Sequence, residues 1–291
     1  MFVTSNTLSA IKRYFNDRMS DKFTTSELKS MFNQLAQDRL NCSTAELLLS
    51  NDRRLSESDL LYFRSAVKRL QQNEPFQHIL GHTEFYGLKI KVNENVLIPR
   101  PETEELVQWV NETIEQRDSI KIVDVCTGSG CIALALKKSF PSAEVVATDF
   151  STGALKVAEE NAKLNDFTIP FLHHDALSFT QSILPEAEHA DVWVSNPPYI
   201  PQREKASMAE HVVDFEPHMA LFVADSDPLC FYDALAKGAL RHLRLGGWLF
   251  VEIHEDLADQ VVNLFEENGL TQVEVKKDLQ GKNRMVRGRK E

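Results

Sequence analysis

The sequence predicts an α/β protein with a small all-helical N-terminal domain and a β-hairpin connector. Helix-start signals fill the first 72 residues, residues 85–98 alternate between apolar and polar, and apolar runs alternate with helical patterns from residue 102 onward. The 291 residues, 43% hydrophobic and 26% charged, are enough for one large and one small domain. We therefore expect a helical domain at residues 1–75, a hairpin linker at 76–101 and an α/β domain at 102–291.

The helical domain is predicted from a repeated helix-start signal. A hydroxyl residue is followed three positions later by an acid in three pairs: Thr24 and Glu27, Ser43 and Glu46, Ser56 and Asp59. Two pairs are capping boxes, and the third, with Asp in the acidic position, is a near match. The last of these helices places apolar side chains on one face with the spacing of a small bundle core: Leu60, Phe63, Val67 and Leu70. Glu74-Pro75 ends this helix.

Residues 85–98 show the alternation that is typical of a β-hairpin. Leu88, Ile90 and Val92 fall on one side, residues 93–95 supply the expected turn, and residues 96–98 supply the returning strand. The connector is expected to end at Pro99-Arg100-Pro101, after which a helix begins.

The rest of the chain alternates apolar strands with helices, which indicates a mainly parallel sheet covered on both faces. We expect strands at 121–125, 144–148, 168–173, 190–195 and 248–253. We expect helices at 102–116, 132–139, 154–165, 229–243 and 257–268. A final hairpin around Gly281 is expected from residues 272–277 and 284–287.

Composition argues against several classes of protein. The formal charge is −11, and the acidic excess lies after residue 75, which argues against a long duplex nucleic acid as substrate. No apolar stretch approaches the ~18 to 20 residues of a membrane span, and no signal peptide opens the chain, so we expect a cytoplasmic protein. The four cysteines form no C-x-x-C pair and no zinc-type spacing with histidine, so no metal site is expected.

A glycine-rich turn between a strand and a helix predicts a cofactor site. The strand at 121–125 runs into Cys126-Thr127-Gly128-Ser129-Gly130, where a ligand can approach the backbone closely. The next strand ends in Asp149, whose carboxylate could accept both hydroxyls of a ribose. Asp175 and Asn196 end the following two strands at the same edge of the sheet, where ligands of open α/β sheets bind. The alternative is that Asp149 and Asp175 only cap the helices that follow them.

The glycine spacing alone leaves the cofactor open. A phosphate-binding loop would need Gly-Lys-Ser/Thr, which is absent after Gly130, whereas a nicotinamide site would accept the looser G-x-G-x-x-A pattern found here. The loop Asn196-Pro197-Pro198-Tyr199 decides the question, because it favours S-adenosylmethionine over both of these ligands.

This loop has the properties of a rigid hydrogen-bond acceptor. Pro197 and Pro198 remove two amide donors and leave nearby carbonyl groups without local partners. A substrate NH2 group could donate one hydrogen to the Asn196 side-chain oxygen and another to the Pro197 carbonyl, while Tyr199 offers a flat face. Positioning would supply most of the catalysis of methyl transfer to such a nitrogen, with no general base required beforehand.

With these residues in hand, the chain resembles the protein glutamine methyltransferases that modify peptide chain release factors. The resemblance covers nearly the whole length and is carried by the helical domain, the glycine loop, the Asn-Pro-Pro-Tyr loop and three further segments: residues 74–81, the signature 97–104 (Leu-Ile-Pro-Arg-Pro-Glu-Thr-Glu) and Phe215-Glu216-Pro217. It implies a Rossmann-like class I methyltransferase domain at 102–291, S-adenosylmethionine as cofactor and the glutamine of a Gly-Gly-Gln loop as methyl acceptor. The helical domain at 1–75 would then help to recognise the release factor.

The resemblance also implies roles for individual residues. Thr127 to Gly130 would surround the methionine part of the cofactor, Asp149 the ribose, and Asp175 with Ala176 the adenine. Cys126 and Asn196 would also belong to the cofactor site. Asn196, Pro197, Pro198 and Tyr199 would hold the glutamine, with Asn196, Pro197 and Tyr199 as the catalytic group. The family loop usually begins with glycine where this chain has Cys126, and relatives often carry a large aromatic residue where it has Ala176.

Three other interpretations remain. A ribosomal-protein glutamine methyltransferase would differ after the Pro-Arg pair, so Pro101-Glu102-Thr103-Glu104 favours the release-factor branch. An adenine amino-methyltransferase of DNA or RNA would use the same acceptor loop after base flipping, but the acidic charge counts against nucleic acid. An inactive cofactor-binding module would not be expected to keep Gly128, Gly130, Asp149 and Asn196.

Overall fold

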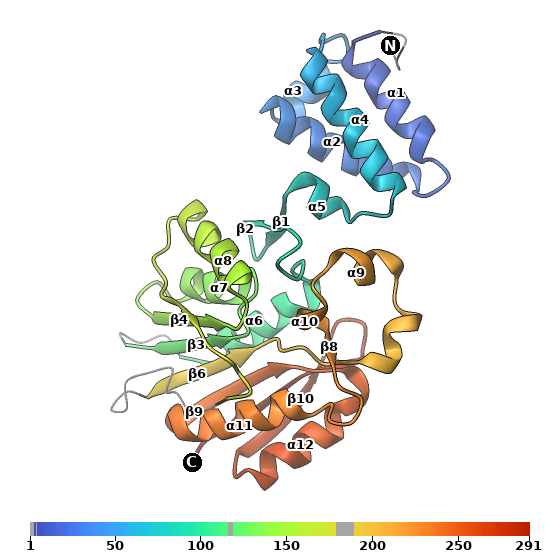
Figure 1. Cartoon of the computed structure of the whole chain (residues 1–291). Helices are drawn as coiled ribbons and strands as arrows, with labels where there is room; N and C mark the ends of the chain where they lie inside the picture. Colours follow the sequence, from blue (N-terminus) through green and yellow to red (C-terminus); the bar gives the residue numbers. More distant parts are fainter. Residues whose placement is uncertain (1–2, 4, 116–118, 179–188) are drawn as a thin grey trace. The chain divides into compact units, whose positions relative to one another are not determined.

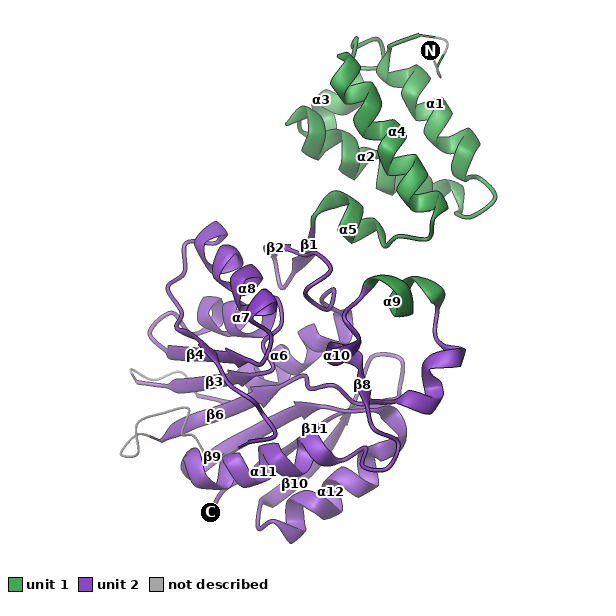
Figure 2. Ribbon diagram, in the orientation of Figure 1, with its two compact units in different colours: residues 1–81, 210–215 green, residues 82–209, 216–291 purple. Residues whose placement is uncertain are grey.

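The computed structural model describes residues 3, 5–115, 119–178 and 189–291 (Figure 1). The chain forms two compact units (Figure 2). The helical unit comprises residues 1–81 and 210–215, and the α/β unit comprises residues 82–209 and 216–291. The helical unit thus extends six residues beyond the sequence boundary at residue 75, because Ile79 and Leu80 pack into its core.

The helical unit contains α1 (Leu8–Met19), α2 (Thr25–Leu40), α3 (Thr44–Leu49), α4 (Glu57–Gln71), α5 (Phe76–Leu80) and α9 (Glu210–Phe215). All three predicted helix starts are confirmed, and each forms a complete capping box, the Ser56 and Asp59 pair included. The core is aromatic at its centre. Phe32 lies against Phe15 at 5.7 Å between ring centroids and stacks on Phe63 at 5.3 Å.

The connector is a hairpin, but its turn lies elsewhere than the sequence predicts. Strands β1 (His82–Phe85) and β2 (Leu88–Lys91) pair antiparallel, so the turn is Tyr86-Gly87 and not residues 93–95. Both turn residues have positive φ, 50° and 67°, which is the geometry of a tight two-residue hairpin loop. Residues 96–98 form no strand. Their path is held instead by side chains, since the Ile98 amide donates to the Glu216 carboxylate at 3.0 Å.

Within the described residues, the α/β unit has a sheet with the strand order β10-β11-β9-β6-β3-β4-β5. The parallel strands are β3 (Lys121–Val125), β4 (Glu144–Asp149), β5 (Phe171–His173), β6 (Ala190–Ser195) and β9 (Leu243–Glu252). Strands β10 (Thr271–Lys277) and β11 (Asn283–Arg289) form the predicted hairpin, and β11 pairs antiparallel with β9. The mainly parallel α/β prediction is therefore confirmed.

Helices cover both faces of this sheet, as predicted (Figure 1). One face packs against α6 (Pro101–Thr113), α7 (Cys131–Ser139) and α8 (Thr152–Leu164), and the other against α11 (Cys230–His242) and α12 (Ala258–Glu267). Alternation along the strands explains the two faces: Val192 and Val194 of β6 belong to the first core, and Trp193 to the second. The end of the predicted helix at residue 116 lies outside the described residues.

Two strands differ in length from the prediction. β5 begins at Phe171 and not at residue 168, because Pro170 has no amide to donate to the ladder. β9 begins five residues before Trp248, and its pairing with β6 shifts register between Ala190 and Val192. Gly246-Gly247, a pair that is typical of turns, therefore lies in a bulge of this strand. A side chain on Gly247 would meet two backbone oxygens there, at 2.9 and 3.1 Å.

The segment after β6 contains short elements that the sequence pattern did not predict: β7 (Ile200–Pro201), a 3-10 turn η1 (Gln202–Ser207), α10 (His218–Leu221) and β8 (Phe222–Val223). A second 3-10 turn, η2 (Glu255–Leu257), leads into α12. Among the described residues, no helix has the length and apolar character needed to cross a membrane.

Candidate active site

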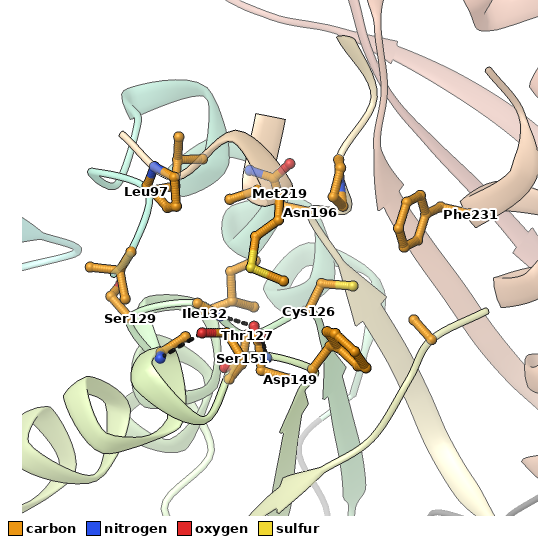
Figure 3. Close-up of a pocket in the computed structure, with 18 of the residues that line it drawn as sticks. Leu97, Cys126, Thr127, Ser129, Ile132, Asp149, Ser151, Asn196, Met219 and Phe231 are labelled. Atoms are coloured by element: carbon orange, nitrogen blue, oxygen red, sulfur yellow. Dashed lines mark hydrogen bonds between the residues drawn. The ribbon is translucent and has the colours of Figure 1, made fainter. Parts of the chain in front are cut away.

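A cavity of about 520 Å³ opens at the carboxyl ends of β3, β4 and β6, inside the α/β unit (Figure 3). Its size lies within the range typical of small-molecule sites. Nine of the predicted site residues line it: Cys126, Thr127, Gly128, Ser129, Asp149, Asp175, Ala176, Asn196 and Pro198. Gly130, Pro197 and Tyr199 do not belong to the lining.

The glycine loop is folded tightly by backbone hydrogen bonds. The Thr127 amide donates to the Thr148 carbonyl and the Gly130 amide to the Thr127 carbonyl, both at 2.9 Å. Three loop residues have positive φ: Cys126 at 61°, Gly128 at 55° and Gly130 at 82°. Gly130 also permits α8 to approach, because a Cβ at this position would lie 3.1 Å from the Ala158 methyl. Gly130 thus shapes the loop and the helix packing around the cavity.

Cys126 adopts a backbone conformation that favours glycine. The left-handed region costs a non-glycine residue on the order of 1 kcal/mol. The side chain faces the cavity (Figure 3). Burial raises the pKa of its thiol above the ordinary range, so Cys126 is present as a neutral thiol.

The Asp149 carboxylate is held by two backbone amides from different segments. Oδ2 accepts from the Gly128 amide at 2.9 Å, and Oδ1 accepts from the Ser151 amide at 2.8 Å. Burial raises the pKa of this carboxyl, and the hydrogen bonds from Ser151 and Gly128 act against that rise. A carboxylate has about four acceptor positions, so each oxygen keeps one position for a ligand. The Asp149 cap of α8 and a ligand role are therefore compatible.

Asp124, two residues before the loop, is a residue that the sequence pattern did not single out. Its side chain is fully buried, and Oδ2 accepts from the Thr127 hydroxyl at 2.6 Å and the Ala133 amide at 3.1 Å. Its Oδ1 has no hydrogen-bond partner in the described part of the chain. Burial raises the pKa of Asp124 to about 7. Asp124 thus joins the glycine loop, through Thr127, to the first turn of α7, through Ala133.

The residues expected to contact the adenine form a turn at Asp175 and Ala176, and the exposed ring of Phe150 also lines the cavity. Asp175 Oδ1 accepts from the Leu177 amide at 2.9 Å, and Ala176 between them is buried. Phe150, which directly follows Asp149, lines the cavity with 55% of its surface exposed. The sequence analysis missed Phe150 because a phenylalanine after an apolar strand carries no chemical signal by itself.

Asn196 enters the cavity from the end of β6. The strand end is fixed by Ser195, whose hydroxyl donates to the Val125 carbonyl at 2.6 Å. Asn196 Nδ2 donates to the Thr103 hydroxyl oxygen at 3.1 Å, which leaves Oδ1 as the acceptor in a residue that lines the cavity (Figure 3). Tyr199 turns its hydroxyl toward Glu252, to which it donates at 2.9 Å.

An ion pair between the half-buried Arg100 and the buried Glu216 supports the cavity rim at Pro99. Glu216 is 4% exposed, and its two carboxylate oxygens accept from the Ile98 amide at 3.0 Å and from Arg100 Nη2 at 2.5 Å. Both partners flank the cavity-lining residue Pro99. The sequence analysis included Arg100 and Glu216 only in segments of family resemblance and gave neither a role.

Apolar side chains form much of the remaining cavity wall. They include Leu97, Ile132, Met219, Phe222 and Phe231, and Met219 is 52% exposed (Figure 3). In the described part of the chain, no group of three or more His, Cys, Asp or Glu side chains is placed to hold a metal ion.

Two family models match the chain. The model described as Methyltransferase small domain matches residues 103–216, and the PrmC N-terminal domain matches residues 24–81. Among solved structures, a methyltransferase from Pyrococcus furiosus has a TM-score of 0.51 at 18% identity, covering 70% of this chain and 89% of its own. The Thermus thermophilus 16S rRNA N2 G1207 methyltransferase, solved with AdoMet and guanosine, has a TM-score of 0.51 at 18% identity, covering 72% and 50%. These structures share the class I methyltransferase fold.

Curated relatives match over nearly the full length. The release factor glutamine methyltransferase of Flavobacterium psychrophilum is 40% identical over 283 residues, covering 95% of this chain and 98% of that protein. The protein of the same name from Bacteroides thetaiotaomicron is 37% identical, covering 96% and 99%. The chain therefore belongs to the release factor glutamine methyltransferase family.

Proposed function

We propose that this protein transfers the methyl group of S-adenosylmethionine to the side-chain amide nitrogen of the glutamine in the Gly-Gly-Gln motif of peptide chain release factors. One observation carries the proposal: a carboxylate suited to a ribose and an amide oxygen suited to a substrate NH2 group line the same cavity. Family membership supports the release factor as the partner.

The residues of the cavity fit S-adenosylmethionine. Asp149 keeps one acceptor position on each oxygen beyond its backbone bonds, which matches the two hydroxyls of a ribose. Phe150 and Ala176 offer apolar surface for an adenine ring, and the glycine loop lets a ligand approach its backbone. When bound, S-adenosylmethionine supplies an electrophilic methyl group on a sulfonium sulfur.

The acceptor loop positions and orients the substrate nitrogen. Asn196 Oδ1 and the Pro197 carbonyl would each accept one hydrogen of the glutamine NH2 group, which directs the nitrogen lone pair away from the loop and toward the methyl group. In the transfer, the N–C bond forms as the S–C bond breaks, and the nitrogen then loses one proton to solvent. This role for Asn196 requires no general base, because the proton leaves after the transfer.

We propose that the helical unit contributes to recognition of the release factor. Its residues lie outside the cavity lining, so they are not needed to build the cofactor site.

A Gly-Gly-Gln loop would meet the apolar wall formed by Leu97 and Met219, and two glycines add little bulk next to the glutamine.

The test is methyl transfer from labelled S-adenosylmethionine to three acceptors: a purified release factor, the same factor with Gln→Ala in its Gly-Gly-Gln motif, and adenine-containing DNA. We expect label on the unmodified factor alone. Label on DNA would move the substrate to nucleic acid, and label on both release-factor forms would place the methyl group at another residue.

Asn196→Ala provides the matching test of the acceptor loop. We expect turnover to fall at least ~100-fold, as for other pre-organised hydrogen-bonding groups at reacting atoms. The Kd for S-adenosylmethionine, measured by calorimetry, should stay within about threefold, since one amide contact is small beside the whole cofactor site. Near-normal turnover would contradict the role proposed for Asn196.

A further inference from the structure

We propose that Thr103 and Glu252 form a buried relay that fixes the orientation of the Asn196 amide and thereby makes the site select glutamine over glutamate. This inference rests on the proposed function and names the residues that set its specificity. Neither Thr103 nor Glu252 contacts the substrate in this scheme. They are positioning residues that act through Asn196.

The relay begins at Glu252, the last residue of β9. Its side chain is 1% exposed, and both carboxylate oxygens accept hydroxyl hydrogens: Oε2 from Thr103 at 2.7 Å and Oε1 from Tyr199 at 2.9 Å. Burial raises the pKa of Glu252, while the two hydroxyl donors and the nearby charge of Arg284 favour its ionised form. Both hydroxyls donate to this side chain, so its two oxygens act as the acceptors of the relay.

The position of Glu252 beside the acceptor loop follows from the sheet. In the parallel pairing of β6 with β9, Ser195 lies opposite Val251. The next residues of the two strands, Asn196 and Glu252, therefore leave the sheet at the same edge. Thr103, in the first turn of α6, lies between them and contacts both side chains.

The direction of these hydrogen bonds determines which end of the Asn196 amide faces the cavity. Thr103 has a single hydroxyl hydrogen, and that hydrogen is donated to Glu252. Only lone pairs remain for Asn196, so its partner must be the NH2 group, at 3.1 Å. A reversed amide would place two acceptor oxygens against each other in a site that is largely removed from water.

The fixed orientation has a consequence for the substrate. Asn196 presents an oxygen, which accepts from the NH2 group of a glutamine and repels the carboxylate of a glutamate. If the relay were broken, the amide could rotate and present its NH2 group, which would oppose the glutamine NH2 and favour a carboxylate. The relay therefore converts a residue that could serve either substrate into an acceptor for one.

The decisive variants are Thr103→Val, which keeps the shape and removes the hydroxyl, and Thr103→Ser, which keeps the hydroxyl. Thr113→Val is the matched control, because Thr113 is on the same helix and its hydroxyl donates to the Trp109 carbonyl outside the cavity lining. Thermal unfolding of each variant confirms that it is folded. A Thr103→Val protein that fails to fold leaves Thr103→Ser and Glu252→Gln as the variants to compare.

Two quantities are measured at pH 8: kcat/KM for the release factor, and the inhibition constant of a release factor with Gln→Glu in its Gly-Gly-Gln motif. We expect Thr103→Val to lower kcat/KM about 10- to 100-fold, the effect of losing or opposing one well-placed hydrogen bond. The Gln→Glu factor should at the same time become a better competitor relative to the Gln factor by about tenfold or more. Thr103→Ser should restore both values, and Thr113→Val should leave both unchanged.

A purely structural defect would weaken both release-factor forms together, so an unchanged preference for Gln over Glu in Thr103→Val overturns the relay. Turnover of the wild-type protein separates failure of the relay from failure of the proposed function. If the wild type does not methylate the release factor, the proposed function is wrong. The relay is then decided by NMR of the Asn196 side-chain amide, identified by loss of its signal in Asn196→Asp. Slower hydrogen exchange in wild type than in Thr103→Val supports the relay, and equal exchange overturns it.

Discussion

Asp149→Asn is the sharpest test of the cofactor half of the site, because it keeps the shape of the side chain and changes only its charge and hydrogen bonding. The carboxylate accepts from the backbone amides of Gly128 and Ser151. In the variant, the new NH2 group must face one of these two donors, so one bond is lost and one amide is left unpaired. Such a loss costs about 1 to 3 kcal/mol.

Two effects therefore follow for Asp149→Asn, one on stability and one on cofactor affinity. Burial already penalises the ionised carboxyl, which offsets part of the loss in the neutral variant, so we expect the free energy of unfolding to fall by about 1 to 2 kcal/mol. At least one charge-assisted bond to the ribose would also be lost, at about 1.5 to 3 kcal/mol. This corresponds to a Kd for S-adenosylmethionine raised roughly 10- to 100-fold.

Urea unfolding without ligand and calorimetric titration with S-adenosylmethionine measure the two effects separately. Asp166→Asn is the matched control, because Asp166 is exposed beyond the end of α8 and undergoes the same chemical change. A Kd within threefold of wild type, together with the expected loss of stability, would refute the ribose role of Asp149 and leave it only as a cap.

Three further predictions follow from buried groups near the cavity. Burial raises the pKa of Asp124 to about 7, so its contribution to stability is complete below pH ~4 and is lost as pH rises through 7. Relative to Asp124→Asn, the wild type should lose about 2 to 3 kcal/mol of unfolding free energy between pH 5 and 7, and parallel profiles in urea titrations would contradict this. Gly130→Ala should lower the free energy of unfolding by about 1 to 3 kcal/mol, because φ is 82° and the new methyl would lie 3.1 Å from Ala158. Gly269→Ala, with φ of 97° and open space around it, isolates the backbone part in the same urea assay. Glu216→Ala should cost about 2 to 4 kcal/mol in urea unfolding, because it leaves a buried amide and an arginine unpaired; a loss below 1 kcal/mol would refute this.

Local sequence signals predicted most of the fold because the deciding interactions are themselves local. The capping pairs at Thr24, Ser43 and Ser56 each form within one helical turn, and all three helices begin where the pairs predict. The strands β3 and β6 match their predicted bounds, because continuous apolar runs bounded by polar residues have few other places in an α/β sheet.

The connector and β9 show where such local reasoning fails. Residues 93–95 have turn-type composition, but Tyr86-Gly87 takes the two-residue hairpin turn because its backbone can reach positive φ at both positions. In β9, Gly246-Gly247 resembles a turn in sequence, yet the strand continues through it as a bulge against β6. In both places, the pairing of distant strands overrides the local signal.

For the site, the sequence indicated the residues on the sheet edge but not those that hold them. Cys126, Asp149 and Asn196 were predicted because each ends or follows a strand, and all three line the cavity. Thr103 lies in the signature 97–104, which carries the family resemblance but indicates no role for this side chain. Glu252 belongs to no motif, since a glutamate at a strand end is common. Only the fold brings these two within 2.7 Å of each other, across 149 positions of sequence.

The helical unit is built from two segments that are far apart in the sequence, and this affects how it folds during synthesis. Residues 1–81 leave the ribosome before residues 82–291, but α9, which completes the unit, is separated from them by residues 82–209. At ~5–20 residues per second, this segment takes roughly 6 to 25 s to synthesise. During that interval Asn73 lacks its hydrogen-bond partner Glu210, so the first unit to begin folding on the ribosome is finished only after most of the second has been translated.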